Sequence, residues 1–318
     1  MSAPEVHELG RDRRLIDLGF RETSGLIGSY VLPLEEGWAI VETGPTRSRE
    51  ALLRGLGIAG IEPREVRQVF VTHIHLDHAG GAGAVEGDLP NAVFYAHESG
   101  VAHLVNPAKL EASARRAWGA VYDQILGPLV PMDPQRIRPL HGGEVFPLKD
   151  GDLKVLATPG HARHHVSFFD APSAAMLTGD SAGVRLPGSD RARPAVPPPD
   201  LDLDQLFASL RAMAAMDPHR LWYTHFGSYP DAKEDLRSYR DSVQEWAGVG
   251  LAAARRDPSV DAISRALREH EVGRMGADAA RRTDAIEDLV SGVEMAAMGL
   301  LRYYEVEGLV RAPAKGRV

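Results

Sequence analysis

Residues 70–81 read FVTHIHLDHAGG and concentrate three imidazoles and one carboxylate in a short stretch: His73, His75, Asp77 and His78. Neutral imidazole and carboxylate are the donors that zinc-like metal ions bind in proteins. Gly80 and Gly81 follow the cluster, where they let the backbone pass close to a site. Burying these groups without a partner would cost several kcal/mol. The stretch therefore predicts a metal site.

The elements that must position this cluster are predicted as short strands with loops at their ends. RQVFVTH is apolar enough for a strand buried on both faces. At a strand end, residues i and i+2 point the same way, so His73 and His75 can hold one ion. Asp77 and His78 follow where the chain turns, and face a neighbouring point. A hairpin is predicted over residues 26–41, and RARPAVPPPD, residues 191–200, predicts an extended loop because of its prolines.

Beyond Pro230 the pattern changes from strands to helices. We therefore predict a catalytic domain at residues 1–230 and a helical subdomain at 231–318, with no flexible linker between them. A stripe of apolar residues at helical spacing runs from Ile286 to Tyr304 and needs a partner surface. We expect it to pack within the helical subdomain, which would lean over the site, with a homodimer as the open alternative.

Composition limits the class of protein. The chain has 318 residues, a net charge of −8 and no cysteine, which excludes disulfides, thiolate metal sites and a cysteine nucleophile. The acidic balance argues against a nucleic-acid partner. No apolar run approaches the ~20 residues of a membrane span. The N-terminal residues lack the apolar core of a signal peptide. We therefore expect a cytoplasmic protein with a small-molecule substrate and no membrane or nucleic-acid partner.

Five motifs in order make the sequence similar to the metallo-β-lactamase superfamily over roughly residues 20–230. They are GSYVLPLEEGWAIVETG, THIHLDHAGG, TPGHARHHVSFF, LTGDS and YTHFG, and the last three supply His161, Asp180 and His225. The resemblance implies an α/β fold, the four-layer αββα sandwich with the site at one edge, here with the C-terminal helical subdomain added. The chain departs from the family's usual Asp-Thr-Gly motif, since it has Glu42 at the first position. That position is usually structural.

The resemblance also implies a ligand set for two divalent metal ions per chain, with Zn²⁺ expected and Mn²⁺ or Fe²⁺ as alternatives. One ion would be held by His73, His75 and His161, the second by Asp77, His78 and His225, and Asp180 would bridge them. Two such ions share a hydroxide, which forms from a bound water whose pKa lies near 7. Asp77 is the expected catalytic residue, because it can orient the hydroxide and carry a proton to the leaving group.

Two further residues carry weaker expectations. His165, in the GHxxxHV pattern, is expected to hydrogen-bond a metal ligand, with a purely structural role as the alternative. Residues 181–200 follow Asp180 directly and are expected to form a pocket wall, from which Arg185 would contact the substrate unless it is simply solvated.

The predicted function is a dinuclear metal-dependent hydrolase, similar to glyoxalase II or to lactonases, acting on an ester, lactone or thioester. Antibiotic hydrolysis is disfavoured because Asp180 stands where many true β-lactamases have Cys. A lactonase function is less favoured, because Gly183 stands where similar lactonases carry Tyr, unless Tyr30 or Tyr223 reaches the site. The alternatives are an iron-dependent redox enzyme similar to sulfur dioxygenases, or a phosphodiesterase.

Overall fold

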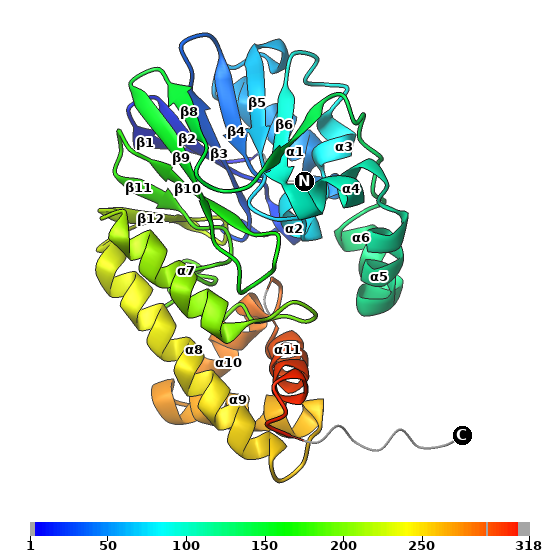
Figure 1. Cartoon of the computed structure of the whole chain (residues 1–318), viewed down its shortest axis with the longest axis vertical. Helices are drawn as coiled ribbons and strands as arrows, with labels where there is room; N and C mark the ends of the chain where they lie inside the picture. Colours follow the sequence, from blue (N-terminus) through cyan, green and yellow to red (C-terminus); the bar gives the residue numbers. More distant parts are fainter. Residues whose placement is uncertain (1–3, 291, 311–318) are drawn as a thin grey trace.

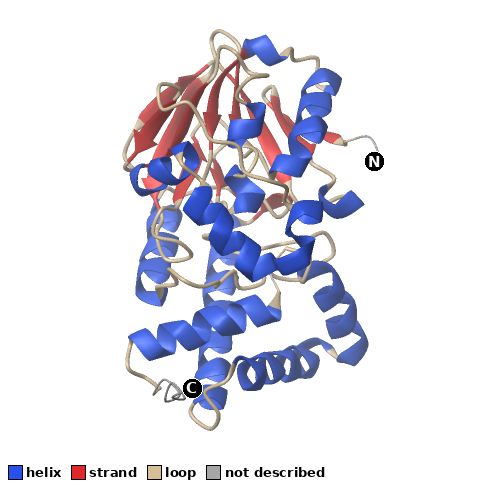
Figure 2. Ribbon diagram, turned by 90° about the vertical axis from the view of Figure 1, so that its right-hand side faces the viewer, coloured by secondary structure: helices blue, strands red, loops and turns tan. Residues whose placement is uncertain are grey.

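The structure, a computed structural model, describes residues 4–290 and 292–310. Within these residues the strands form two sheets, one of seven strands in the order β1 to β7 and one of six in the order β13-β12-β11-β10-β9-β8. Figures 1 and 2 show both sheets in one part of the molecule and the long C-terminal helices in the other.

The first sheet begins as an antiparallel meander and ends as a parallel sheet. Its strands β1 to β4 pair antiparallel, and β4 to β7 pair parallel. The predicted hairpin is the β3–β4 pair, closed by a turn in which the Leu34 amide donates to the Gly37 carbonyl; Gly37 has φ +88°, which glycine adopts without strain. The strands are β1 (Val6–Gly10), β2 (Arg13–Asp17), β3 (Gly28–Pro33), β4 (Trp38–Val41), β5 (Val66–Phe70), β6 (Val93–His97) and β7 (Ile137–Leu140).

The central strands of the second sheet, β10 to β12, are buried on both faces. Phe168 and Trp222 pack into the core shared with the first sheet, whereas their neighbours Phe169 and Tyr223 pack into a second core with the helices. The alternation follows from the two-residue period of a strand. The strands are β8 (Val145–Leu148), β9 (Gly151–Ala157), β10 (Val166–Asp170), β11 (Ala175–Leu177), β12 (Arg220–Tyr223) and β13 (Gly227–Pro230).

Helices cover the outer faces of the two sheets. Leu52 and Leu56 of α1 pack with Ile16 of the first sheet, and Leu206 of α7 and Leu236 of α8 pack on the outer face of the second. This arrangement confirms the predicted αββα sandwich with a helical C-terminal part. The helices are α1 (Arg49–Ile58), α2 (Leu76–Ala79), α3 (Ala82–Val85), α4 (Glu98–Val105), α5 (Ala108–Trp118), α6 (Tyr122–Ile125), α7 (Leu203–Ala215), α8 (Ala232–Ala254), α9 (Val260–Met275), α10 (Ala277–Glu287) and α11 (Val293–Val306).

Short 3₁₀ helices lie in the connections, at η1 (Phe20–Glu22), η2 (Thr46–Ser48), η3 (Pro63–Glu65) and η4 (Gly119–Val121). None of the described helices combines the length and the apolar character needed to cross a bilayer.

The apolar stripe that was expected from Ile286 to Tyr304 is divided between two helices. α10 ends at Glu287 and α11 begins at Val293, because Gly292 caps α11 in an extended conformation. Val293 and Tyr304 are buried in the second core, as expected for packing within the helical part, but Ile286 is 46% exposed. The prediction of one continuous apolar stripe from Ile286 to Tyr304 was therefore wrong. The boundary at residue 230 stays a prediction, and residues 311–318 of the predicted subdomain lie outside the described residues.

Candidate metal centre

The opening motif follows the buried strand β5, as predicted, but its second half forms a helical turn. His73 lies beyond the end of β5 and is fully buried. His75 caps the N-terminus of α2, which places Asp77 and His78 in the first turn of that helix. The change from strand to helix therefore directs the two pairs of side chains toward neighbouring points.

The second sheet brings three more predicted residues to the same place. His161 follows β9, Asp180 follows β11 and His225 follows β12, so each lies just beyond the end of a strand. Their donor atoms and those of the opening motif lie within 4.8 Å of one another in three groups that could hold a metal ion: His73, His75 and His161; His73, His78 and Asp180; and Asp77, His78 and His225.

The distances divide the cluster into two halves with Asp180 between them. In the first half, His161 Nε2 lies 3.0 Å from His75 Nδ1. In the second half, His225 Nε2 lies 3.2 Å from His78 Nε2. Asp180 Oδ1 lies 3.2 Å from His78 Nε2, and its Oδ2 lies 3.7 Å from His161 Nε2. Each carboxylate oxygen of Asp180 thus faces a different half.

In His161, His225 and His73, the hydrogen bond made by Nδ1 shows which ring nitrogen carries the proton. His161 Nδ1 lies 2.9 Å from the Ala195 carbonyl oxygen, and His225 Nδ1 lies 2.7 Å from the Leu26 carbonyl oxygen. Carbonyl oxygens only accept hydrogen bonds, so both Nδ1 atoms carry protons. In its neutral form, each ring then directs the lone pair of Nε2 into the cluster, which is the arrangement that metal-binding histidines adopt.

Thr72 gives the same result for His73. Its hydroxyl donates to Glu42, so its oxygen is free to accept from His73 Nδ1 at 3.0 Å. His73 Nε2 is then a buried lone pair, and neither it nor Asp180 Oδ1 has a hydrogen-bond partner among the described residues. Converging lone pairs repel one another unless a cation lies between them. The donor set therefore fits metal ions.

The electrostatics differ between the two halves. Burial, reinforced by the neighbouring imidazoles, lowers the pKa of His73 and of His75 well below 6.5. In the second half, burial opposes charge on His78, but Asp180, Glu42 and Asp77 outweigh it and raise the pKa of His78 well above 6.5. Burial alone would raise the pKa of Asp77, but His78 and His225 outweigh that effect and lower this pKa to about 2.

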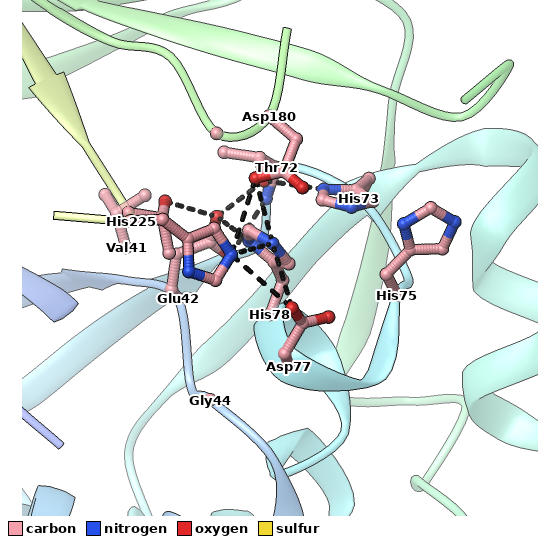
Figure 3. Close-up of polar contacts among 12 residues, drawn as sticks. Val41, Glu42, Gly44, Thr72, His73, His75, Asp77, His78, Asp180 and His225 are labelled. Atoms are coloured by element: carbon pink, nitrogen blue, oxygen red, sulfur yellow. Dashed lines mark hydrogen bonds and ion pairs between the residues drawn. The ribbon is translucent and has the colours of Figure 1, made fainter. Parts of the chain in front are cut away.

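Glu42 is the residue that the sequence interpretation underrated. Its buried carboxylate lies 3.0 Å from His78 Nδ1 and accepts from the hydroxyl of Thr72 (Figure 3). It also accepts from the hydroxyl of Thr224. It therefore contacts one ring of the cluster directly and reaches His73 through Thr72. Glu42 has φ +75°, an uncommon conformation for a residue with a side chain, and such residues cluster at functional sites.

His165 lies where a metal ligand can be oriented. The Asp180 amide donates to His165 Nε2 at 3.1 Å, while His165 Nδ1 lies 2.8 Å from the Thr158 hydroxyl. His165 is thus bonded to the backbone that carries Asp180. His164 is also buried, with its ring edge-on to His75 at 5.8 Å, and burial lowers its pKa to about 3.

Arg185 turns toward the C-terminal helices. Its guanidinium forms an ion pair with Asp235 of α8 and lies 4.2 Å from the centre of the Tyr229 ring. Its predicted contact with substrate stays a prediction.

The structure places neither Tyr30 nor Tyr223 where it substitutes for a tyrosine at position 183. Gly183 has φ +82°, and a Cβ there would lie 2.3 Å from the Tyr239 ring, so the backbone excludes tyrosine. The Tyr30 hydroxyl donates to the Tyr223 carbonyl, and the Tyr223 ring packs on Tyr229. Among the residues that the structure describes, neither hydroxyl forms a hydrogen bond with a member of the cluster.

Comparison with known proteins identifies relatives with the same fold. A sequence model of the metallo-beta-lactamase superfamily matches residues 23–225. The metallo-beta-lactamase fold-containing protein ST1585 of Sulfurisphaera tokodaii is 28% identical over 165 residues, which are 50% of this chain and 60% of that protein. This chain therefore spans less than two thirds of that relative's length.

Two solved structures resemble almost the whole chain. The metallo-beta-lactamase family protein TTHA1429 from Thermus thermophilus matches with a TM-score of 0.61 at 21% identity, over 96% of this chain and 92% of that one. A beta-lactamase domain protein from Burkholderia ambifaria matches with a TM-score of 0.67 at 18% identity, over 96% and 90%. At these identities the likeness concerns the fold, and it includes the C-terminal helices.

Proposed function

This chain belongs to the metallo-beta-lactamase superfamily, and we propose that it is a dinuclear metal-dependent hydrolase of an ester, lactone or thioester. The proposed ligands of the first ion are His73, His75 and His161, and those of the second are Asp77, His78 and His225, with Asp180 shared. Zinc is the proposed metal, because imidazole and carboxylate without thiolate suit Zn²⁺, although Mn²⁺ and Fe²⁺ accept the same donors.

The observation that carries the proposal is the convergence of lone pairs. His161 and His225 donate their Nδ1 protons to carbonyl oxygens, so their Nε2 atoms face the other donors at distances of 3.0 and 3.2 Å. When bound here, two divalent ions would activate water as a nucleophile and polarise the carbonyl oxygen of the substrate.

The proton transfers are assigned to Asp77. Its side chain is 24% exposed, whereas those of His78 and His225 are fully buried, so Asp77 lies on the side of the cluster open to solvent. It is ionised at neutral pH and can therefore accept a proton from the nucleophile and pass it to the leaving group.

The proposal is tested by loading purified protein with Zn²⁺ or Mn²⁺ and assaying it against lactones, thioesters, aryl esters and phosphodiesters. Hydrolysis of one of the first three classes, lost on chelation and restored by the metal, is the expected result. Cleavage of phosphodiesters alone would replace the proposed substrate class.

Metal analysis separates hydrolysis from the redox alternative. Protein purified without added metal is expected to bind two ions per chain on titration. One iron per chain, with oxygen consumed during turnover, would overturn the hydrolase and support redox chemistry on the same scaffold.

A further inference from the structure

The segment at residues 183–195 lies between the candidate metal centre and the C-terminal helices. On its inner side, the Arg185 amide donates to the His225 carbonyl at 2.5 Å, and the Phe226 amide donates to the Arg185 carbonyl at 3.2 Å. Near its other end, the Ala195 carbonyl accepts from His161 Nδ1. This segment therefore contacts one proposed ligand residue from each half of the cluster, His161 through its ring and His225 through its backbone carbonyl.

On its outer side, charged side chains tie the same segment to the helices. Arg185 pairs with Asp235 of α8, and Asp190 pairs with Arg274 of α9. Arg191 pairs with Glu245 of α8 at 2.9 Å and with Glu271 of α9 at 3.2 Å. The C-terminal helices thus hold the segment that contacts the ring of His161 and the backbone of His225.

The Arg185–Asp235 pair is the one closest to the metal centre along the chain and is well shielded from solvent. Its side chains are only 16% and 10% exposed, and Arg185 Nε and Asp235 Oδ2 have no hydrogen-bond partner among the described residues. Removing one partner would leave an uncompensated charge in a region of low dielectric, which is strongly unfavourable. The backbone of Arg185 would then shift to relieve that charge.

We propose that Arg185 is a positioning residue for His225. Its ion pair with Asp235 anchors it to α8, its guanidinium stacks on Tyr229, and its backbone amide holds the carbonyl of His225. Through this connection the C-terminal helices set the geometry of the second donor group, formed by Asp77, His78 and His225. The inference rests on the proposed dinuclear centre and adds a role for the helical part of the chain.

The experiment compares Arg185→Gln and Asp235→Asn with a matched control, Arg237→Gln. Arg237 also pairs with a carboxylate, Glu234, on α8, but both side chains are well exposed. Co²⁺ is titrated into the metal-free proteins, and the two stepwise affinities and the visible spectrum are recorded with the thermal midpoint of the metal-free protein.

Both variants are expected to weaken binding of the second ion by about tenfold or more, the size of effect known for residues that orient metal ligands. The first ion and the control should keep wild-type affinities, and the spectrum of the second ion should change. A structural role alone would lower the thermal midpoint without separating the two affinities.

Other outcomes overturn the assignment. Affinities equal to those of Arg237→Gln would do so, as would a raised KM with unchanged metal binding, which would instead indicate substrate contact. If Arg185→Gln does not fold, Asp235→Asn decides, because asparagine keeps the size of the side chain and one acceptor oxygen. Wild-type protein that binds fewer than two ions overturns the proposed function itself, before any variant is compared.

Discussion

The carboxylate of Glu42 and the ring of His78 lie 3.0 Å apart, Oε1 to Nδ1, and both side chains are fully buried. Glu42 comes from the end of β4 and His78 from α2, so the contact joins the first sheet to the helical turn that carries half of the candidate centre. It sets the direction in which His78 Nε2 points.

Glu42→Gln should therefore weaken metal binding. Glutamine keeps the size of the side chain but loses the charge that supports His78, and we expect the affinity for the second ion to fall about 10–100-fold. Isothermal titration of the metal-free protein measures the change. Glu36→Gln, in the exposed turn between β3 and β4, is the control and should bind both ions like wild type. An equal affinity in the two variants would contradict an orienting role for Glu42.

Asp77→Asn should lower activity more than it lowers metal content. Asparagine keeps an oxygen donor near His225 but cannot take up a proton, so we expect kcat to fall about 10²–10⁴-fold. Metal analysis of the same samples, with both ions supplied in excess, checks that the centre remains filled. Activity that falls only in proportion to lost metal would show that Asp77 is a ligand without a proton-carrying role.

Acidification should remove the second ion before the first. The pKa values of His78 and His225 are raised by neighbouring carboxylates against the effect of burial, so protons compete for these rings as the pH falls through neutrality. The pKa values of His73 and His75 are lowered by burial, so these rings stay neutral and available at lower pH. Metal content measured at equilibrium from about pH 8 to about pH 5, the range in which histidine titrates, should fall in two steps. Simultaneous loss of both ions would contradict this ordering.

Truncation after Pro230 should give an unstable protein with altered substrate preference. The outer face of the second sheet, including Phe169 and Tyr223, would keep α7 but lose α8 and the helices that follow it. A milder test is Leu236→Ala on α8, where the side chain is 3% exposed and the expected loss in the free energy of unfolding is about 2–5 kcal/mol. Urea unfolding measures that loss. A truncated protein that stays soluble, keeps both metals and retains its kcat/KM would refute a role for the helices at the site.

Much of the fold was predictable because its signals are local. The hairpin at β3–β4, the buried strand β5 and the helices after Pro230 follow from residue type and period alone. The break between α10 and α11 was missed because apolar spacing continues across it, while the backbone at Gly292 is extended. The spacing of apolar residues indicates which residues are buried. Two helices that pack on one core can show the same spacing as one continuous helix.

The sequence by itself determined the chemistry of the candidate centre, because imidazole and carboxylate are recognisable as metal donors wherever the chain places them. Only the tertiary structure decided which donors meet and how each ring is oriented. His78 and His225 lie 147 residues apart in the chain, yet their Nε2 atoms are 3.2 Å apart. The groups that orient the rings, namely the carbonyls of Leu26 and Ala195 and the carboxylate of Glu42, come from distant segments. A carbonyl is present at every residue, so its role depends on packing and has no signature in the sequence.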